Sequence, residues 1–216
     1  MSGPKIQLYF DFISPYSYLA SQLIARRPEY QALELVYRPV VFGTMLSRLG
    51  TKGPGEIPQR RRQGLQDVLL LAQLYDIPLA GPPTHPFNSL YALRSVCAAP
   101  SEKQGPLTAA YFAATWGRGE SLEDMAVLRR CLAEVGVTQD PEEAASAREN
   151  RAAVKANTAE LLERGGWGVP SFWLDDLLLF GHDRLPLLVA YVEGRVQQAP
   201  AQLAELLARP QPGRIT

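Results

Sequence analysis

The chain has 216 residues, 46% of them hydrophobic and 20% charged, a composition typical of a globular protein with a substantial core. Its 22 Lys and Arg residues equal its 22 Asp and Glu residues, so we expect no general attraction to nucleic acid or to an anionic membrane. The chain does not open on a basic leader with a long apolar run, and no segment is apolar for long enough to span a bilayer. We therefore expect a soluble, cytoplasmic protein.

The first 40 residues have the pattern strand, helix, strand. Apolar side chains alternate with others over 6–12, which is the period of a strand with one buried face. The Ser14-Pro15 pair suits the N-cap and first position of a helix, which Pro28 ends. A second strand begins near Leu33 and stops before Pro39. Such a unit is almost always right-handed and parallel.

The middle of the chain, 44–157, contains mainly helical patterns. Apolar residues at spacings of three and four predict one helix with Leu65, Val68, Leu69 and Ala72 on a single face. The Gly- and Pro-containing stretches at 50–58 and 80–88 are expected to be loops. Cys97 and Cys131 lie in apolar helical contexts, so we expect buried, reduced thiols rather than a disulfide framework or a zinc site.

Strand patterns return near the end of the chain. The segment "VPSFWLDDLLLFG" predicts a hairpin that turns at Asp175 and Asp176. A helix is expected over 183–194, and a shorter one from Pro200 to about Arg209. The order is then βαβ, an all-helical insertion, and ββα. This α/β arrangement predicts a thioredoxin-like domain, 1–43 plus 158–216, interrupted by a helical domain, 44–157.

Three motifs carry a family resemblance. "FDFISPYSYLA" near the start, "GVPSFWL" near the end and "FGHDRL" just after it occur in a specific order and spacing, with "AQLYDIPL" and "WGRGE" between them. Together they resemble the DsbA-like thioredoxin branch that contains 2-hydroxychromene-2-carboxylate isomerases and kappa-class glutathione transferases. The resemblance covers nearly the whole chain.

The resemblance places Ser14 where thiol redox relatives have a low-pKa cysteine at a helix start. A hydroxyl cannot form a disulfide, but the helix dipole and the free N–H groups there still favour an anion. The resemblance therefore implies that Ser14, with Pro15 and Tyr16, stabilises the thiolate of glutathione, a cofactor supplied from outside. The local pattern alone slightly favours an ordinary N-cap at Ser14, with Pro15 in the first turn.

The same resemblance implies the other glutathione contacts. Pro170 would be a cis proline, and Val169 would pair its main chain with the cysteinyl part of glutathione. Asp183 would take the γ-glutamyl ammonium group, although a plain N-cap is the alternative. At His182 the family often has a small polar or amide residue, so contact through the backbone is favoured over imidazole chemistry.

A basic run, "QRRRQ" at 59–63, offers Arg60 or Arg61 for the glycyl carboxylate, with Thr51 as a polar neighbour. A solvated helix start is the alternative for such a run. The pattern does not choose between the two arginines.

The second substrate requires an apolar pocket with a polar partner. The resemblance points to Asn88 at a helix start, with Tyr91, Trp116 and Trp173 as candidate walls, although such aromatic residues are more often core. His85 is as readily a loop histidine as a ligand. No paired Cys, Asp or Glu residues at ligand spacing occur, so no protein-bound metal is expected.

The resemblance implies a glutathione-dependent isomerase that interconverts 2-hydroxychromene-2-carboxylate and trans-o-hydroxybenzylidenepyruvate, or acts on a related small aromatic carboxylate. The first alternative is a kappa-like glutathione transferase or peroxidase. The second is a non-catalytic thioredoxin-like module that binds an extended peptide. The family also implies a homodimer.

Overall fold

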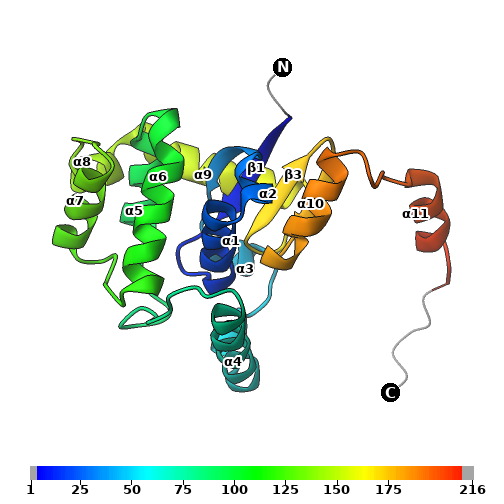
Figure 1. Cartoon of the computed structure of the whole chain (residues 1–216), viewed down its shortest axis with the longest axis horizontal. Helices are drawn as coiled ribbons and strands as arrows, with labels where there is room; N and C mark the ends of the chain where they lie inside the picture. Colours follow the sequence, from blue (N-terminus) through cyan, green and yellow to red (C-terminus); the bar gives the residue numbers. More distant parts are fainter. Residues whose placement is uncertain (1–3, 211–216) are drawn as a thin grey trace.

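The structure is a computed structural model that describes residues 4–210, so residues 1–3 and 211–216 of the predicted thioredoxin-like domain lie outside the described part (Figure 1). Four strands and eleven α-helices make up this part. The strands are β1 (Lys5–Phe10), β2 (Glu34–Pro39), β3 (Ser171–Leu174) and β4 (Leu177–Phe180). The helices are α1 (Pro15–Arg26), α2 (Pro28–Gln31), α3 (Phe42–Arg48), α4 (Pro58–Leu74), α5 (Leu90–Ala98), α6 (Ser101–Phe112), α7 (Met125–Glu134), α8 (Pro141–Ser146), α9 (Arg148–Glu163), α10 (Leu185–Val192) and α11 (Pro200–Leu207).

The strands form one mixed sheet in the order β2-β1-β3-β4. β1 pairs with β2 in parallel, through α1 as the crossover, and β3 is antiparallel to both β1 and β4. The predicted hairpin turns at Asp175 and Asp176, which both have positive φ. The predicted thioredoxin order βαβ…ββα is confirmed.

The two faces of the sheet bury different side chains because neighbouring residues of a strand point to opposite sides. One row, Tyr37, Leu8, Phe172 and Leu179, runs across all four strands and belongs to the main core beneath α1 and α10. The opposite face carries Tyr9 and packs on α3 and α9 in a smaller cluster. Ser14, at the start of α1, belongs to the first of these layers.

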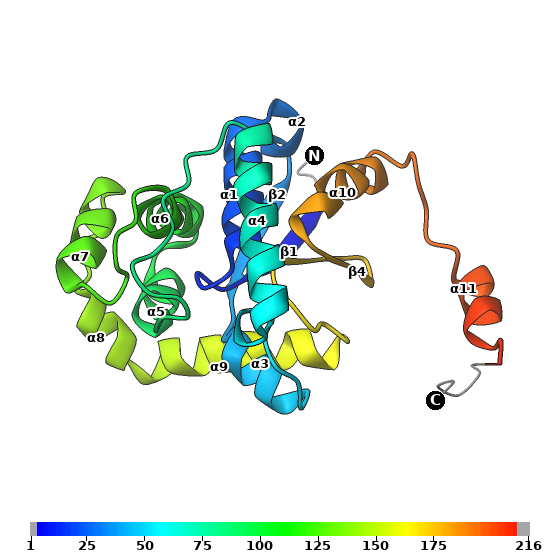
Figure 2. The ribbon, with the colours of Figure 1, turned by 90° about the horizontal axis from the view of Figure 1, so that it is seen from below.

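Helices α5 to α8 and the loops that flank them, called the helical block below, lie beside the sheet. Figure 1 shows α5 to α8 together on the side away from α10, and Figure 2 shows α9 running from this block toward α3. Helix α9 is continuous across residues 157 and 158, where the sequence pattern places the domain boundary. That boundary therefore lies within a single helix that also packs on β2.

Three details differ from the sequence prediction. β2 includes Pro39, and an edge strand tolerates a proline because one side of its ladder has no partner. Pro28 does end α1, but it also begins the short helix α2. On α4, Val68 and Ala72 are buried, whereas Leu65 is 43% and Leu69 is 52% exposed.

Helix α11 contributes no buried residue and stands apart from the rest of the chain in both views (Figures 1 and 2). Its exposed leucines are Leu203, Leu206 and Leu207. Within residues 4–210, no helix is long and apolar enough to cross a membrane.

Candidate functional site

Ser14 is the N-cap of α1 and is almost completely buried. Its Oγ accepts a hydrogen bond from the Ser17 N–H at 3.1 Å and donates one to the Val169 carbonyl, also at 3.1 Å. One side chain thus links the start of α1 to the loop before β3. The hydroxyl can rotate, so its proton is able to move from the Val169 oxygen to another acceptor.

The first turn of α1 retains one free backbone donor. Pro15 has no N–H, the Ser17 N–H bonds to the Ser14 hydroxyl, and the Tyr18 N–H bonds to the Ser14 carbonyl at 3.1 Å. Among the described residues, the Tyr16 N–H has no hydrogen-bond partner. A helix start with an unpaired N–H and a positive dipole end favours an anion.

The loop that delivers Ser14 is fixed by side chains from distant parts of the chain. Trp116, in a π-helical turn after α6, donates its Nε1–H to the Phe12 carbonyl at 2.8 Å. His85 Nε2 lies 2.9 Å from the Ile13 carbonyl oxygen, and the centroids of the His85 and Trp116 rings are 5.6 Å apart. The helical block therefore determines where Ser14 lies.

Asp11 is the third anchor. Its carboxylate is buried and accepts hydrogen bonds from the Ser89 hydroxyl at 2.6 Å and from the N–H groups of Phe42 at 2.9 Å and Ile13 at 3.2 Å. Burial raises the pKa of Asp11, and these hydrogen bonds partly oppose that effect. The side chain ties β1 to the starts of α3 and α5.

The Val169-Pro170 peptide bond is cis and lies opposite the start of α1. The loop is compact: the Ser171 hydroxyl donates to the Gly168 carbonyl at 2.8 Å, and the Gly181 N–H donates to the Pro170 carbonyl at 2.9 Å. Gly168 is required because a Cβ there would lie 2.4 Å from a ring carbon of Phe180. We call the group Ser14, Tyr16, Val169 and Pro170 the Ser14 site.

His182 borders this site. Its ring is 7% exposed and stacks on the Tyr16 ring, with centroids 5.4 Å apart. Burial lowers the pKa of His182, while the charges of Asp183 and Asp67 partly oppose the shift. Its Nε2 has no hydrogen-bond partner in the described chain. Burial thus favours the uncharged form of this imidazole, which packs against the rings of Tyr16 and Tyr75.

Asp183 is half exposed, and its carboxylate pairs with Arg184 at 2.7 Å. Gly181 precedes it with a φ of 111°, and a Cβ there would lie 2.4 Å from Asp183 Oδ1. The motif "GHD" therefore requires its glycine in order to bring the carboxylate back over the backbone. A cation from outside would compete with Arg184 for this exposed carboxylate.

The basic run lies in the first turns of α4. Arg60, Arg61 and Thr51 are all exposed. The Tyr16 hydroxyl donates to Asp67 Oδ2 at 2.8 Å, and Gly64 lies beside the same hydroxyl. Because residues four and seven apart share a helix face, Arg60 lies on the face of Gly64 and Asp67, which contacts Tyr16.

The candidate substrate residues occupy separate places. Asn88 precedes Ser89, the N-cap of α5, and its Oδ1 accepts from the Leu90 N–H at 3.1 Å, while Tyr91 packs against the main core. Trp116 is 2% exposed. Trp173 lies on the sheet face covered by α9, where the Arg164 guanidinium is 4.4 Å from its ring centroid. The structure thus places Trp173 across the sheet from α1.

Both cysteines lie in the helical block, Cys97 on α5 and Cys131 on α7. Burial raises the pKa of Cys97 to about 11 and also raises that of Cys131, so neither favours a thiolate. No cluster of three or more His, Cys, Asp or Glu side chains suited to a metal occurs within residues 4–210.

A model of the DSBA-like thioredoxin domain matches residues 5–193. The chain belongs to the DsbA-like thioredoxin family. A solved 2-hydroxychromene-2-carboxylate isomerase superposes on this DsbA-like fold with a TM-score of 0.78 at 27% identity, covering 94% of this chain and 98% of that one. The cytosolic disulfide reductase DsbM from Pseudomonas aeruginosa, solved with GSH, has a TM-score of 0.63 at 21% identity, over 88% and 98% of the two chains. That likeness shows the fold alone.

Two curated relatives indicate the branch of the family. The 2-hydroxychromene-2-carboxylate isomerase of Sphingobium xenophagum is 29% identical over 87% of this chain and 97% of its own. The glutathione S-transferase kappa 1 of Caenorhabditis elegans is 25% identical over 97% and 93%. The family resemblance seen in the three motifs is confirmed, and the relatives are isomerases and transferases.

Proposed function

We propose that this protein is a glutathione-dependent isomerase that interconverts 2-hydroxychromene-2-carboxylate and trans-o-hydroxybenzylidenepyruvate, or acts on a related small aromatic carboxylate. The observation that carries the proposal is the Ser14 hydroxyl, which faces Val169 and Pro170 at a helix start with a free Tyr16 N–H. The similarity to isomerases over nearly the whole chain supports the choice of reaction.

The residues of the Ser14 site fit glutathione. A thiolate beside Ser14 would receive the hydroxyl proton now donated to Val169 and the unpaired Tyr16 N–H. Rotation of the hydroxyl away from Val169 also frees that carbonyl, so the Val169 main chain becomes available to an extended peptide. Asp183 is exposed enough to bind an ammonium group.

When bound, glutathione would supply a thiolate that adds to the conjugated double bond of the substrate, allows rotation about it, and leaves again without net oxidation. The protein's own contribution is electrostatic. Ser14 and the Tyr16 N–H would hold the sulfur of bound glutathione in its ionised form, while Trp116 and His85 keep the loop in place. With serines at 14 and 17, no disulfide exchange competes at this site.

We assign the glycyl carboxylate to Arg60 rather than to Arg61. Arg60 shares the α4 face of Gly64 and Asp67, which contacts Tyr16, whereas Arg61 shares the face of Val68 and Ala72. We expect Arg60→Gln to raise the KM for glutathione about fivefold, because exposed ion pairs contribute about 1 kcal/mol or less. Arg61→Gln is the matched control, and a larger effect from it would reverse the assignment.

The second substrate would approach from the helical block. We propose that Asn88 and Tyr91 form the wall of the site on this side. The Asn88 Oδ1 accepts from Leu90, which leaves the amide NH2 group to donate to a carboxylate or phenol. Trp173 lies across the sheet, so we leave it out of the proposed contacts.

One assay separates the proposed function from its two alternatives. We expect isomer interconversion that requires glutathione but leaves its total thiol concentration unchanged. Stoichiometric loss of thiol with the carboxylate substrate, or faster conjugation of chlorodinitrobenzene, would establish a kappa-like transferase or peroxidase instead. Peptide binding with neither activity would establish a binding module.

We further propose a cytoplasmic homodimer, which agrees with the exposed apolar surface on two helices. Leu69 and Leu74 on α4 are 52% and 72% exposed, and Leu207 on α11 is 68% exposed. Large exposed apolar side chains such as these are candidates for burial in an interface. Light scattering after size exclusion tests the dimer, and a monomer at all concentrations would contradict it.

A further inference from the structure

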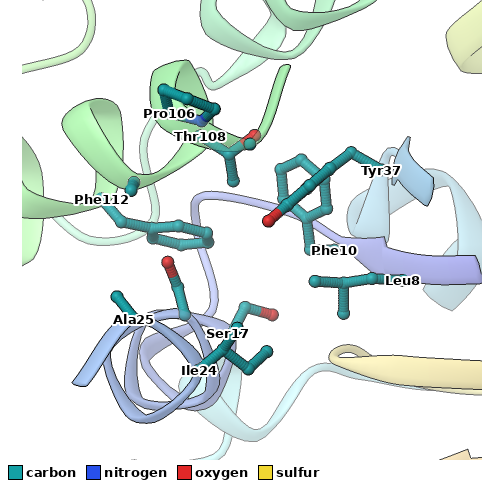
Figure 3. Close-up of a pocket in the computed structure, with 12 residues that line it drawn as sticks. Leu8, Phe10, Ser17, Ile24, Ala25, Tyr37, Pro106, Thr108 and Phe112 are labelled. Carbon is teal, nitrogen blue, oxygen red and sulfur yellow. The ribbon is translucent and has the colours of Figure 1, made fainter. Parts of the chain in front are cut away.

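A cavity lies between α1, β2 and α6, away from the Ser14 site, and Leu8 and Phe10 of β1 also line it. Its volume is about 260 Å³. Figure 3 shows Phe10, Tyr37 and Phe112 around it, with the Tyr37 hydroxyl pointing toward the middle of the group and Ser17 on α1 below. An apolar cavity of ~150 Å³ is enough for benzene. A substituted aromatic ring therefore fits here.

Ser17 supplies an unsatisfied hydroxyl to this cavity. It is 2% exposed, and its Oγ has no hydrogen-bond partner among the described residues. A buried hydroxyl without a partner is costly, and a ligand or water that bonds to it removes the cost. No proposed function of the Ser14 site uses this side chain.

Tyr37 supplies the second polar group. Burial raises the pKa of Tyr37, so the phenol stays protonated and is able to donate. Gly105 on α6 makes room for it, since a Cβ there would lie 2.9 Å from the Tyr37 oxygen. Tyr37 is only partly buried, and among the described residues its hydroxyl makes no hydrogen bond to the protein, so it is open to a ligand.

The cavity is lined by apolar side chains and hydroxyls, without a charged side chain. A carboxylate would be buried there with no cation to compensate it, whereas a neutral aromatic molecule would stack against three rings. Ile24, Tyr37, Gly105 and Pro106 also line a more open depression that includes Gln31 and Glu102. This depression is a route to solvent.

We propose that the cavity between α1, β2 and α6 is a binding site for a small neutral aromatic molecule with one hydroxyl or carbonyl group, which Ser17 and Tyr37 recognise. It is separate from the Ser14 site, because Ser17 lies one helical turn further along α1 and the ring of Phe112 packs on Phe12 at 4.7 Å between the two. The proposal does not depend on the glutathione chemistry.

The test uses p-cresol as the probe, with toluene and benzoate as its apolar and anionic counterparts. In ¹H–¹⁵N spectra of the whole protein with excess glutathione, we expect saturable shifts at the amides of Ser21, Gly105 and Thr108. We expect p-cresol to bind about fivefold more tightly than toluene, and benzoate not to bind. Absence of saturable shifts, equal binding of benzoate, or displacement of p-cresol by glutathione would overturn the proposal.

Two substitutions complete the test. Ser17→Ala should remove the preference for p-cresol over toluene, and a preserved preference would show that the hydroxyl does not recognise the ligand. Ala109→Leu should fill the cavity and abolish p-cresol binding, while Ala152→Leu, on the exposed face of α9, should leave it intact. If Ala109→Leu does not fold, Ala25→Leu fills the same cavity from α1. Binding that survives a folded filling variant contradicts the assignment.

Discussion

Ser14 and Ser17 belong to one tetrapeptide and lie one helical turn apart, yet their surroundings are opposite. Ser14 is the N-cap, linked to Ser17 N–H and Val169 carbonyl, and lies at the positive end of the α1 dipole. Ser17 is inside the helix, among Phe10 and Phe112, and its hydroxyl has no partner within residues 4–210. The first environment favours an anion, and the second favours a neutral molecule.

The difference shows that position in the helix, not residue type, determines what a serine can bind. At the N-terminus the backbone supplies donors that a hydroxyl merely supplements. One turn later those donors are used within the helix, and the hydroxyl depends on its neighbours. In this chain the residues that share the cavity with Ser17 come from α1, β1, β2 and α6 and are mostly apolar.

The largest expected effect comes from Ser14→Ala. Loss of the donor should lower kcat for isomerisation about 100- to 1,000-fold, the usual cost of removing a preorganised donor at a developing anion. Stability should fall by about 1 kcal/mol through loss of the N-cap. Steady-state kinetics with saturating glutathione and urea unfolding measure the two effects.

Ser146→Ala removes an exposed hydroxyl that bonds only to its own helix, and it is the control for this substitution. If Ser14→Ala also abolished p-cresol binding, the two serines would not define independent regions. A kcat within twofold of the unsubstituted protein would show that Ser14 does not hold the thiolate.

The sequence predicts the sheet, the helix starting at Ser14 and the hairpin at Asp175 because period-two alternation, N-cap chemistry and turn residues are local signals. It also predicts the pairing of distant motifs through a resemblance to the family. The sequence does not distinguish Arg60 from Arg61, because packing determines which face of α4 is turned toward Tyr16. The position of Trp173 likewise follows from β-sheet register.

Of the features that the sequence analysis missed, only the anchoring role of Asp11 has a local signal in the sequence. Asp11 is the single charged residue between Lys5 and Arg26, and a lone carboxylate within such an apolar stretch indicates a buried anchor. The roles of Trp116 and His85 as supports for Phe12 and Ile13 depend on contacts between residues far apart in the chain. The cavity beside Ser17 is lined from four separate elements and has no local signature in the sequence.

Trp116→Phe tests whether the helical block positions Ser14. The phenyl ring retains much of the packing but leaves the Phe12 carbonyl without its donor. We expect kcat to fall about tenfold with the KM for glutathione nearly unchanged, since small misplacements of a catalytic group are costly. An unpaired buried carbonyl should also cost about 1–3 kcal/mol in the free energy of unfolding.

Trp173→Phe is the comparison, because it changes the same residue type on the far face of the sheet. We expect the larger loss of kcat from Trp116→Phe. Equal losses in both variants, or a change confined to the KM for glutathione, would contradict a positioning role for Trp116.

The smallest expected effect is the pH dependence of stability that His182 contributes. Burial lowers its pKa below the ordinary 6.5, so the unfolded chain binds a proton more readily than the folded one just below that pH. The contribution of the uncharged His182 side chain to the free energy of unfolding is therefore fully present above pH 6.5. It is lost as the pH falls toward the pKa of His182 in the folded chain. For one proton the slope is at most about 1.4 kcal/mol per pH unit.

His182→Phe removes the titration but retains a ring that can stack on Tyr16. Urea unfolding from about pH 8 to about pH 5 should show the unsubstituted protein losing more stability than this variant on the acid side. His182→Asn also removes the titration, so it should share the flatter profile while being less stable at every pH. A His182→Phe profile parallel to that of the unsubstituted protein would mean that the imidazole titrates alike in the folded and unfolded states, and burial against Tyr16 would then not lower its pKa.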